Sequence, residues 1–170
     1  HITGNYVTVM WLNDAFAIIA GRELLGMPKL YADIPDIQQD GNDWSFYCSA
    51  YGTRLVEGAI KNVTPADEAL RREMERNANE SNWMGWKYIP KPDWSGAELS
   101  LPTCYRNAAK VDQAWFGEPS HTFLEASWLD CSFHSKAMEG LRTLPVKEYR
   151  AGVVTKGQFD LLLGECRNLE

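Results

Sequence analysis

The sequence lacks both a long hydrophobic run and a basic charge balance. No apolar stretch approaches the roughly 20 residues that a membrane-spanning helix needs. The formal net charge is −6. Nucleic acids and anionic membranes bind basic surfaces, so we expect neither as a partner. Small anionic substrates stay open, because a single local positive charge is enough to bind one.

The sequence motifs of several common active sites are also absent. No GxGxxG or GxxxxGK[ST] loop occurs, which removes the usual phosphate-binding loops. No GxSxG elbow occurs, so no sequence motif supports a hydrolase. His121 and His134 lie thirteen residues apart in the chain, with no third ligand in view, and we expect no metal site.

The four cysteines form no CxxC pair, so they are interpreted either as buried structural thiols or as a disulfide pair in a secreted protein (Cys48, Cys104, Cys131, Cys166). We favour the first interpretation and a cytoplasmic location. Hydrophobic residues make up 45% of the chain and charged residues 24%, which is typical of a globular protein. With 170 residues, no repeat and no low-complexity linker, residues 1–170 are interpreted as a single domain.

Short apolar or alternating runs separated by turn residues dominate the chain and predict a strand-rich fold. In 43–51, Trp44, Phe46, Cys48 and Ala50 share one face, because side chains alternate along a strand. We expect strands at 6–12, 15–20, 43–51, 55–63, 83–89, 98–105, 109–115 and 122–129.

Helical spacing marks fewer segments. Thr64 can cap a helix that runs to about Asn79, with Pro65 at its first position. A second helix is expected at about 156–169, and a third, short one at 135–141. The sum is an α+β fold in which sheet or barrel dominates.

The most unusual local stretch is GRELLGMPKL, from Gly21 to Leu30. Its only lysine, Lys29, has apolar neighbours such as Met27 and Leu30. Desolvation disfavours an ammonium ion and lowers its pKa, and a neutral amine is the form that attacks a ketone. From the local sequence alone, an ordinary exposed loop lysine remains the simpler interpretation.

This stretch resembles the acetoacetate decarboxylase family, whose members carry a GRE-x(4)-PK segment after an apolar strand. The matching residues here are Gly21, Arg22 and Glu23, followed by Pro28 and Lys29. Further segments are similar to the family in the same order, over nearly the whole chain: NYVTVMWLNDAFAIIAGREL (5–24), NWMGWKYIPKPDWSGAELSL (82–101), QAWFGEPSHTFLE (113–125) and LPVKE (144–148).

The resemblance implies a cone-like β-barrel or sheet flanked by helices, with an apolar interior that holds the lysine. It also implies that Lys29 forms a Schiff base with a keto acid, which loses carbon dioxide without any bound cofactor. Candidate substrate-binding residues are Arg22, Glu23, Met10 and Met27. Homo-oligomers are expected, since family members tend to be oligomeric.

Two features depart from the family pattern. Decarboxylases proper carry a second lysine directly after the Schiff-base lysine, and they are the standard example of a lysine activated beside a cation. Here Leu30 occupies that position, so Lys29 must rely on burial or on a cation such as Arg22. Family members also extend upstream of residue 1, where an arginine and a glutamate of the pocket lie. We therefore expect an upstream segment or a separate N-terminal chain to supply the missing first strands.

Three functions stay open at this point. The first is a lyase that decarboxylates a β-keto acid. The second uses the same iminium for aldol condensation and dehydration, or for cyclisation, and Leu30 mildly favours it. The third is a non-catalytic small-molecule-binding protein of the same fold.

Overall fold

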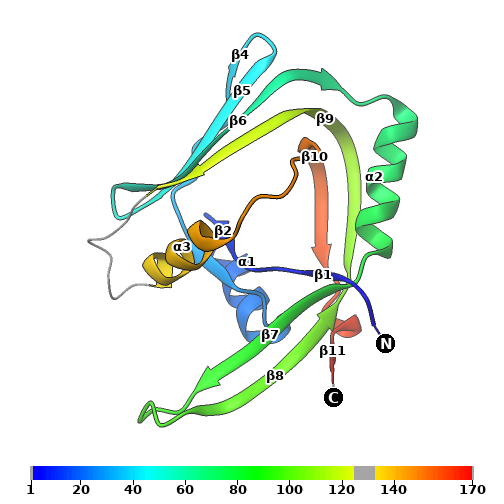
Figure 1. Ribbon diagram of the computed structural model, residues 1–170. Coiled ribbons are helices and arrows are strands. Elements are labelled where there is room, and N and C mark those ends of the chain that lie inside the picture. The colour runs from blue at the N-terminus through cyan, green and yellow to red at the C-terminus, as the bar shows by residue number, and fades with distance from the viewer. Residues whose placement is uncertain (1, 125–132, 170) are drawn as a thin grey trace.

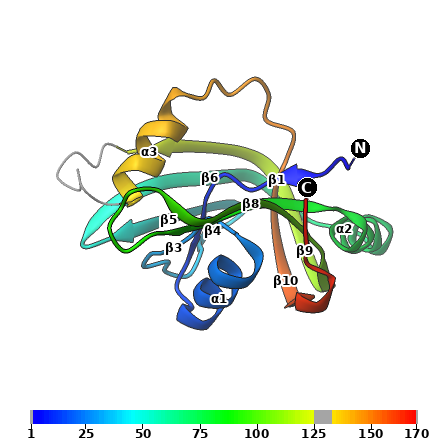
Figure 2. The same cartoon turned by 90° about the horizontal axis from the view of Figure 1, so that it is seen from below.

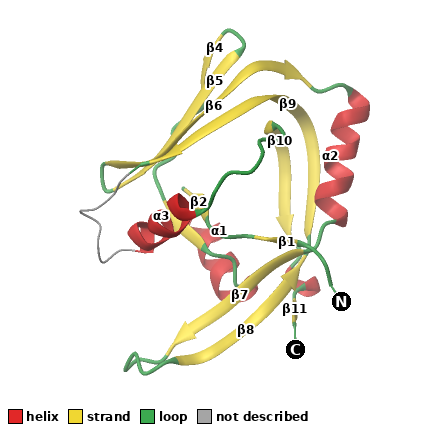
Figure 3. Ribbon diagram, in the orientation of Figure 1, coloured by secondary structure: helices red, strands yellow, loops and turns green. Residues whose placement is uncertain are grey.

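The computed structural model describes residues 2–124 and 133–169, and strands dominate it (Figure 3). The larger sheet is antiparallel. Its strands, in spatial order, are β10 (Gly152–Leu161), β9 (Asn107–Phe123), β6 (Thr53–Pro65), β5 (Asp43–Ala50) and β4 (Gln38–Asp40). A second sheet has the order β1 (Asn5–Tyr6), β7 (Trp83–Pro90), β8 (Ala97–Tyr105) and β11 (Arg167–Asn168).

The remaining elements are short. A parallel strand pair joins β2 (Met10–Leu12) to β3 (Lys29–Tyr31). The helices are α1 (Ala15–Ile19), continued by a π-helical turn over Ala20–Leu24, then α2 (Glu68–Glu80), α3 (Phe133–Thr143) and a 3₁₀ turn over Leu163–Glu165. Across residues 2–124 and 133–169, no helix is long and apolar enough to cross a membrane.

The two larger sheets lie on opposite sides of the molecule, with β2 and α3 between them (Figure 1). Seen from below, α1 and α3 lie on opposite sides of the strands (Figure 2). The long strand β9 bends strongly, and its pairing shifts register against β6 and against β10, as β-bulges permit. The described strands therefore form curved sheets around a common interior, and the predicted strand-dominated α+β fold is confirmed.

Within the described residues, the buried core forms three clusters. One joins β5, β6 and α3 through Cys48, Leu55 and Met138. A second lies beneath the Lys29 region and consists of Leu25, Met27 and Tyr105. The third lies under the larger sheet and consists of Trp44, Ile60 and Val63. The second cluster is the one that holds the loop before Lys29 in place.

Helix α2 covers an edge of the larger sheet. β6 pairs with β9 over 115–123, and at 107–114 no strand of the described residues pairs with β9 on that side. There Asn79 accepts from Ala109 N at 2.7 Å and donates to Ala109 O at 3.0 Å, while Glu75 accepts from Val111 N at 2.7 Å. The polar side chains of α2 therefore satisfy backbone groups that an open sheet edge would leave unpaired.

Most predicted strands are confirmed, but three predictions are wrong. The run 15–20 is helical, because Asp14 caps it by accepting from Ala17 N at 3.1 Å. The predicted helix at 156–169 is instead the end of β10, which pairs with β9 as far as Leu161, followed by the 3₁₀ turn and β11. The cap of α2 is Asp67, which accepts from Leu70 N at 2.8 Å, whereas Thr64 belongs to β6.

Two other strand predictions are confirmed only in part. The strand predicted at 6–12 is divided between β1 and β2. The strand predicted at 122–129 is observed at 122–123 as the end of β9, and residues 125–129 lie outside the described residues. The short helix predicted at 135–141 is confirmed within α3.

Candidate active site

Lys29 begins β3 and lies against the neighbouring strand β2. The two strands run parallel, and Met10 is the partner of Lys29 in the register. The backbone of Met10 donates to Pro28 O at 3.0 Å, which fixes the chain just before the lysine. Although it is a lysine, Lys29 is only 3% exposed. Fully buried lysines are rare, so this side chain needs a specific environment.

That environment comes from the segment of α1 and the π-helical turn. The Nζ atom of Lys29 donates to the backbone oxygen of Ala17 at 2.9 Å. Burial lowers the pKa of the Lys29 amine, because desolvation penalises its charged form. The negative charge of Asp14 acts in the opposite direction and offsets part of this effect. The net direction favours the neutral, nucleophilic amine.

Lys29 lines a cavity of about 570 Å³. Its other charged lining residue, within the described part of the chain, is Arg22. Most of the wall is apolar or aromatic and comes from the loop before Lys29 and from the β7–β8 hairpin: Met27, Pro28, Leu30, Trp86, Tyr88 and Trp94. An apolar cavity with a few polar groups is the usual form of a small-molecule site.

The structure brings some of the predicted residues together and separates others. Lys29, Arg22 and Met27 share the cavity. Glu23 is exposed and does not line it. Met10 packs against the cluster of Leu25, Met27 and Tyr105 beneath the cavity instead. Contact of Glu23 or Met10 with a substrate stays a prediction.

Several residues of this site were not predicted individually. Trp86, Tyr88 and Trp94 lie in the segment 82–101, which was identified only through its resemblance to the family. The carbonyl of Ala17 gave no signal, because any residue carries one. Its role depends on the turn from α1 into the π-helix, which the sequence pattern predicted as a strand.

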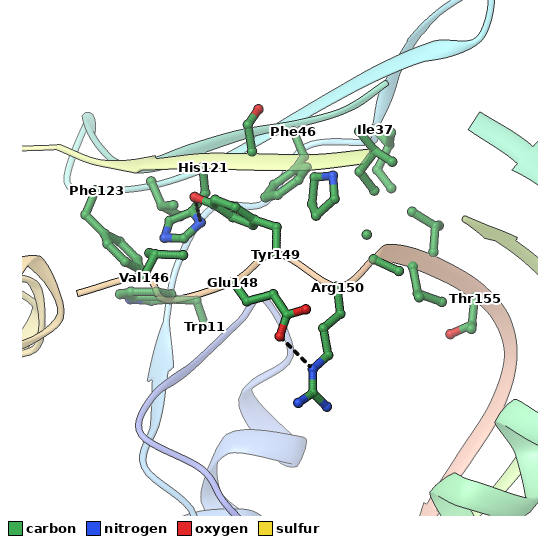
Figure 4. Close-up of a pocket in the computed structure, with 18 residues that line it drawn as sticks. Trp11, Ile37, Phe46, His121, Phe123, Val146, Glu148, Tyr149, Arg150 and Thr155 are labelled. Atoms are coloured by element: carbon green, nitrogen blue, oxygen red, sulfur yellow. Dashed lines mark hydrogen bonds and ion pairs between the residues drawn. The ribbon is translucent and has the colours of Figure 1, made fainter. Parts of the chain in front are cut away.

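A second and larger cavity, of about 930 Å³, lies beneath the larger sheet (Figure 4). Aromatic side chains such as Trp11, Phe46 and Phe123 line it. His121 Nδ1 and the Tyr149 hydroxyl are 3.1 Å apart within it, and Glu148 and Arg150 form an ion pair of 3.5 Å nearby. Lys29 does not line this cavity.

The histidines and cysteines considered in the sequence can be placed in the structure, apart from Cys131. No group of three or more His, Cys, Asp or Glu residues suited to a metal ion occurs within 2–124 and 133–169. His134 is buried, and its Nδ1 accepts from Trp11 Nε1 at 3.2 Å, so it links α3 to β2. Cys48 and Cys104 are buried free thiols and Cys166 is a half-buried one, whereas Cys131 lies outside the described residues.

Comparison with known families decides the relationship of this chain. The acetoacetate decarboxylase (ADC) profile matches residues 1–167. The chain belongs to this family. The match includes the residues that line the Lys29 cavity and those that line the larger cavity. It confirms the resemblance that the sequence motifs indicated. A comparison with curated proteins gives no significant match.

Solved structures of this family share the fold. A structure described as acetoacetate decarboxylase matches with a TM-score of 0.70 and 21% identity, over 98% of this chain and 62% of that chain. An acetoacetate decarboxylase-like enzyme from Sphingomonas wittichii RW1 gives 0.66 and 20%, over 97% and 62%. The enduracididine biosynthesis enzyme MppR, complexed with the condensation product of pyruvate and imidazole 4-carboxaldehyde, gives 0.57 and 17%, over 94% and 57%. The chain therefore spans about six-tenths of the length of these relatives.

Proposed function

We propose that this chain belongs to a Schiff-base-forming lyase that decarboxylates a β-keto acid, with Lys29 as the catalytic residue. The observation that carries the proposal is a lysine only 3% exposed that nevertheless lines an apolar cavity, in a chain of the acetoacetate decarboxylase family. Buried ionisable groups with a shifted pKa in a cavity are candidates for catalysis. The motif position and the geometry support the same residue.

The chemistry follows from a neutral amine. The Lys29 nitrogen attacks the ketone carbon of the substrate, and loss of water gives an iminium ion. The carbon–carbon bond to the carboxylate breaks, and its electron pair moves into the iminium to give an enamine and carbon dioxide. Protonation of the enamine carbon and hydrolysis then release the ketone and regenerate Lys29. Covalent catalysis of this kind divides one difficult step into easier ones.

Arg22 is the residue suited to orient the substrate. It lines the same cavity as Lys29, and a guanidinium group can hold a carboxylate with two parallel hydrogen bonds. The aromatic wall of Trp86, Tyr88 and Trp94 suits an apolar substituent at the far end of the keto acid. A cavity within the range of about 300–1,000 Å³ holds ligands of drug size, so we expect keto acids bulkier than acetoacetate to react better.

A second candidate function uses the same iminium for aldol condensation and dehydration, or for cyclisation. Leu30 favours it, because this apolar residue stands where decarboxylases carry a second lysine, and it lines the Lys29 cavity. The related fold of MppR was solved with a condensation product of pyruvate, which supports the same alternative.

The test is reduction with borohydride in the presence of acetoacetate, of a bulkier β-keto acid and of pyruvate. Peptide mass spectrometry should find the reduced adduct on Lys29 and not on exposed lysines such as Lys110, which serve as internal controls. Release of carbon dioxide then indicates decarboxylation, and a new carbon–carbon bond indicates condensation. If no keto acid gives an adduct on Lys29, both enzymatic proposals fail and a binding protein of this fold remains.

A further inference from the structure

We propose that Gly21 is a positioning residue for Lys29: its missing side chain creates the slot that holds the end of the lysine, and the carbonyl of Ala17 fixes the amine there. The observations concern the packing of these three residues. Gly21 is buried in the π-helical turn Ala20–Leu24. The slot is part of a turn type that is rare in proteins and frequent at functional sites.

The packing distances show how little room the slot has. A Cβ atom built on Gly21 would lie 2.6 Å from both Cδ and Cε of Lys29, and 2.7 Å from its Nζ. Carbon atoms in favourable contact are about 3.5–4.0 Å apart. Any side chain at position 21 would therefore occupy space that the lysine now fills. The atoms it would displace are the flexible end of a side chain, not backbone.

Hydrogen bonds tie Gly21 to the residues on both sides of the slot. Its backbone oxygen accepts from Met27 N at 3.0 Å, close to the point where the chain enters β3. The carbonyl of Ala17, one turn earlier, accepts from the Lys29 amine at 2.9 Å. The amine is therefore held between a backbone acceptor and a glycine whose own position is fixed relative to Lys29.

This packing has a chemical consequence. In the slot the amine is removed from water, which is the cause of its lowered pKa. A methyl group at position 21 would push the amine out towards the cavity and solvent. The displaced lysine would regain hydration, and more of it would be protonated at neutral pH. Gly21 therefore controls how much neutral amine is present, without contacting the substrate.

The experiment is the substitution Gly21→Ala, read by the pKa of Lys29 from NMR of ¹³C-labelled lysine. We expect the pKa to rise towards 10.5, the value of an unperturbed lysine. Adduct formation near pH 7 should fall by roughly tenfold for each unit of that rise, and it should recover at alkaline pH. Gly140→Ala is the matched control, because it adds a helical methyl group with no atom within 4 Å. It should change neither the pKa nor the adduct.

A double-mutant cycle keeps the inference testable if Gly21→Ala unfolds the protein. In a Lys29→Ala background the added methyl group has no lysine to displace, so Gly21→Ala should then be tolerated. Equal destabilisation in both backgrounds would mean that Gly21 is needed for the local backbone conformation and not for the packing of Lys29. That result would overturn the inference. So would an unchanged Lys29 pKa in a folded Gly21→Ala variant.

The adduct readout rests on the proposed function, whereas the pKa readout does not. If the wild-type protein forms no adduct with any keto acid, the Schiff-base proposal fails. A rise of the Lys29 pKa in Gly21→Ala would still support the positioning role. The two failures are thus distinguishable in one set of samples.

Discussion

Burial of Lys29 has a consequence for stability as well as for reactivity. Its pKa is lowered from 10.5 in the folded state, so the unfolded chain binds more protons between the folded pKa and 10.5. Over that window the free energy of unfolding must rise with pH. Below the folded pKa, the free energy of unfolding is lowered by the full cost of holding the ammonium ion out of water.

The substitution Lys29→Met tests this cost. Methionine has a similar shape and no charge, so the variant should be more stable than the wild type at neutral pH, on the order of 1 kcal/mol or more. The difference should shrink as the pH rises from the folded pKa towards 10.5, because the folded lysine is then neutral and deprotonating the unfolded one costs less and less free energy. Urea denaturation at a series of pH values measures it. Lys110→Met is the control, because Lys110 is exposed and its ion pair with Asp112, across 3.6 Å, is worth about 0–1 kcal/mol. A wild type more stable than Lys29→Met at neutral pH would contradict the prediction.

The sequence could indicate Lys29 but not the features that hold it. The motif lies within one short stretch of sequence, so it can be recognised without any structure (Gly21, Arg22, Glu23, Pro28 and Lys29). The slot is a matter of three-dimensional packing. A glycine in a sequence shows that a side chain is missing, but only the structure shows which atoms use the space, here the end of Lys29.

At the scale of elements, strands with alternating burial were predictable and short apolar runs were not. In β5, Trp44, Cys48 and Ala50 are all buried, as the alternation indicates. The run 15–20 has no alternation, and a short apolar run of this kind fits either a buried strand or a helix. The N-cap formed by Asp14 stabilises the helix over the strand. At the C-terminus, pairing with β9 selects the strand β10, and no local pattern in 152–161 reports that partner.

Helix α2 gives a prediction at this scale. Asn79 makes two hydrogen bonds to the backbone of Ala109, on a part of β9 that pairs with no further strand in the described part of the chain. Asn79→Ala leaves that N–H and C=O without their partners and should lower the free energy of unfolding by about 1–3 kcal/mol. Urea denaturation of both variants measures the loss. The control on the same helix is Arg72→Ala, since Arg72 pairs with Glu68 on the exposed face and should matter by less than about 0.5 kcal/mol. Equal losses would show that the edge contacts contribute nothing specific.

At the scale of the whole molecule, apolar side chains remain exposed around the Lys29 site. On α1 and the π-helical turn, Phe16, Ile19 and Leu24 are at least half exposed. The π-helical turn of this segment contacts β7, on which Trp86 and Tyr88 are also about half exposed. Exposed large apolar groups on neighbouring elements are a common feature of interaction sites. We therefore expect this face to be covered in the assembled protein, and we propose a second copy of the chain as the cover.

Sedimentation velocity over a range of concentrations tests the proposed self-association. The wild-type chain should form dimers or larger species, and Phe16→Glu should shift it towards the monomer, because a carboxylate cannot be buried unpaired at low cost. Phe16 is 82% exposed on α1. The matched control is Phe159→Glu on the edge strand β10, where Phe159 is 56% exposed but belongs to the other sheet, so it should leave the association unchanged. A wild-type chain that stays monomeric at all concentrations would reject a second copy as the cover. An equal effect of both substitutions would reject the α1 face as the interface.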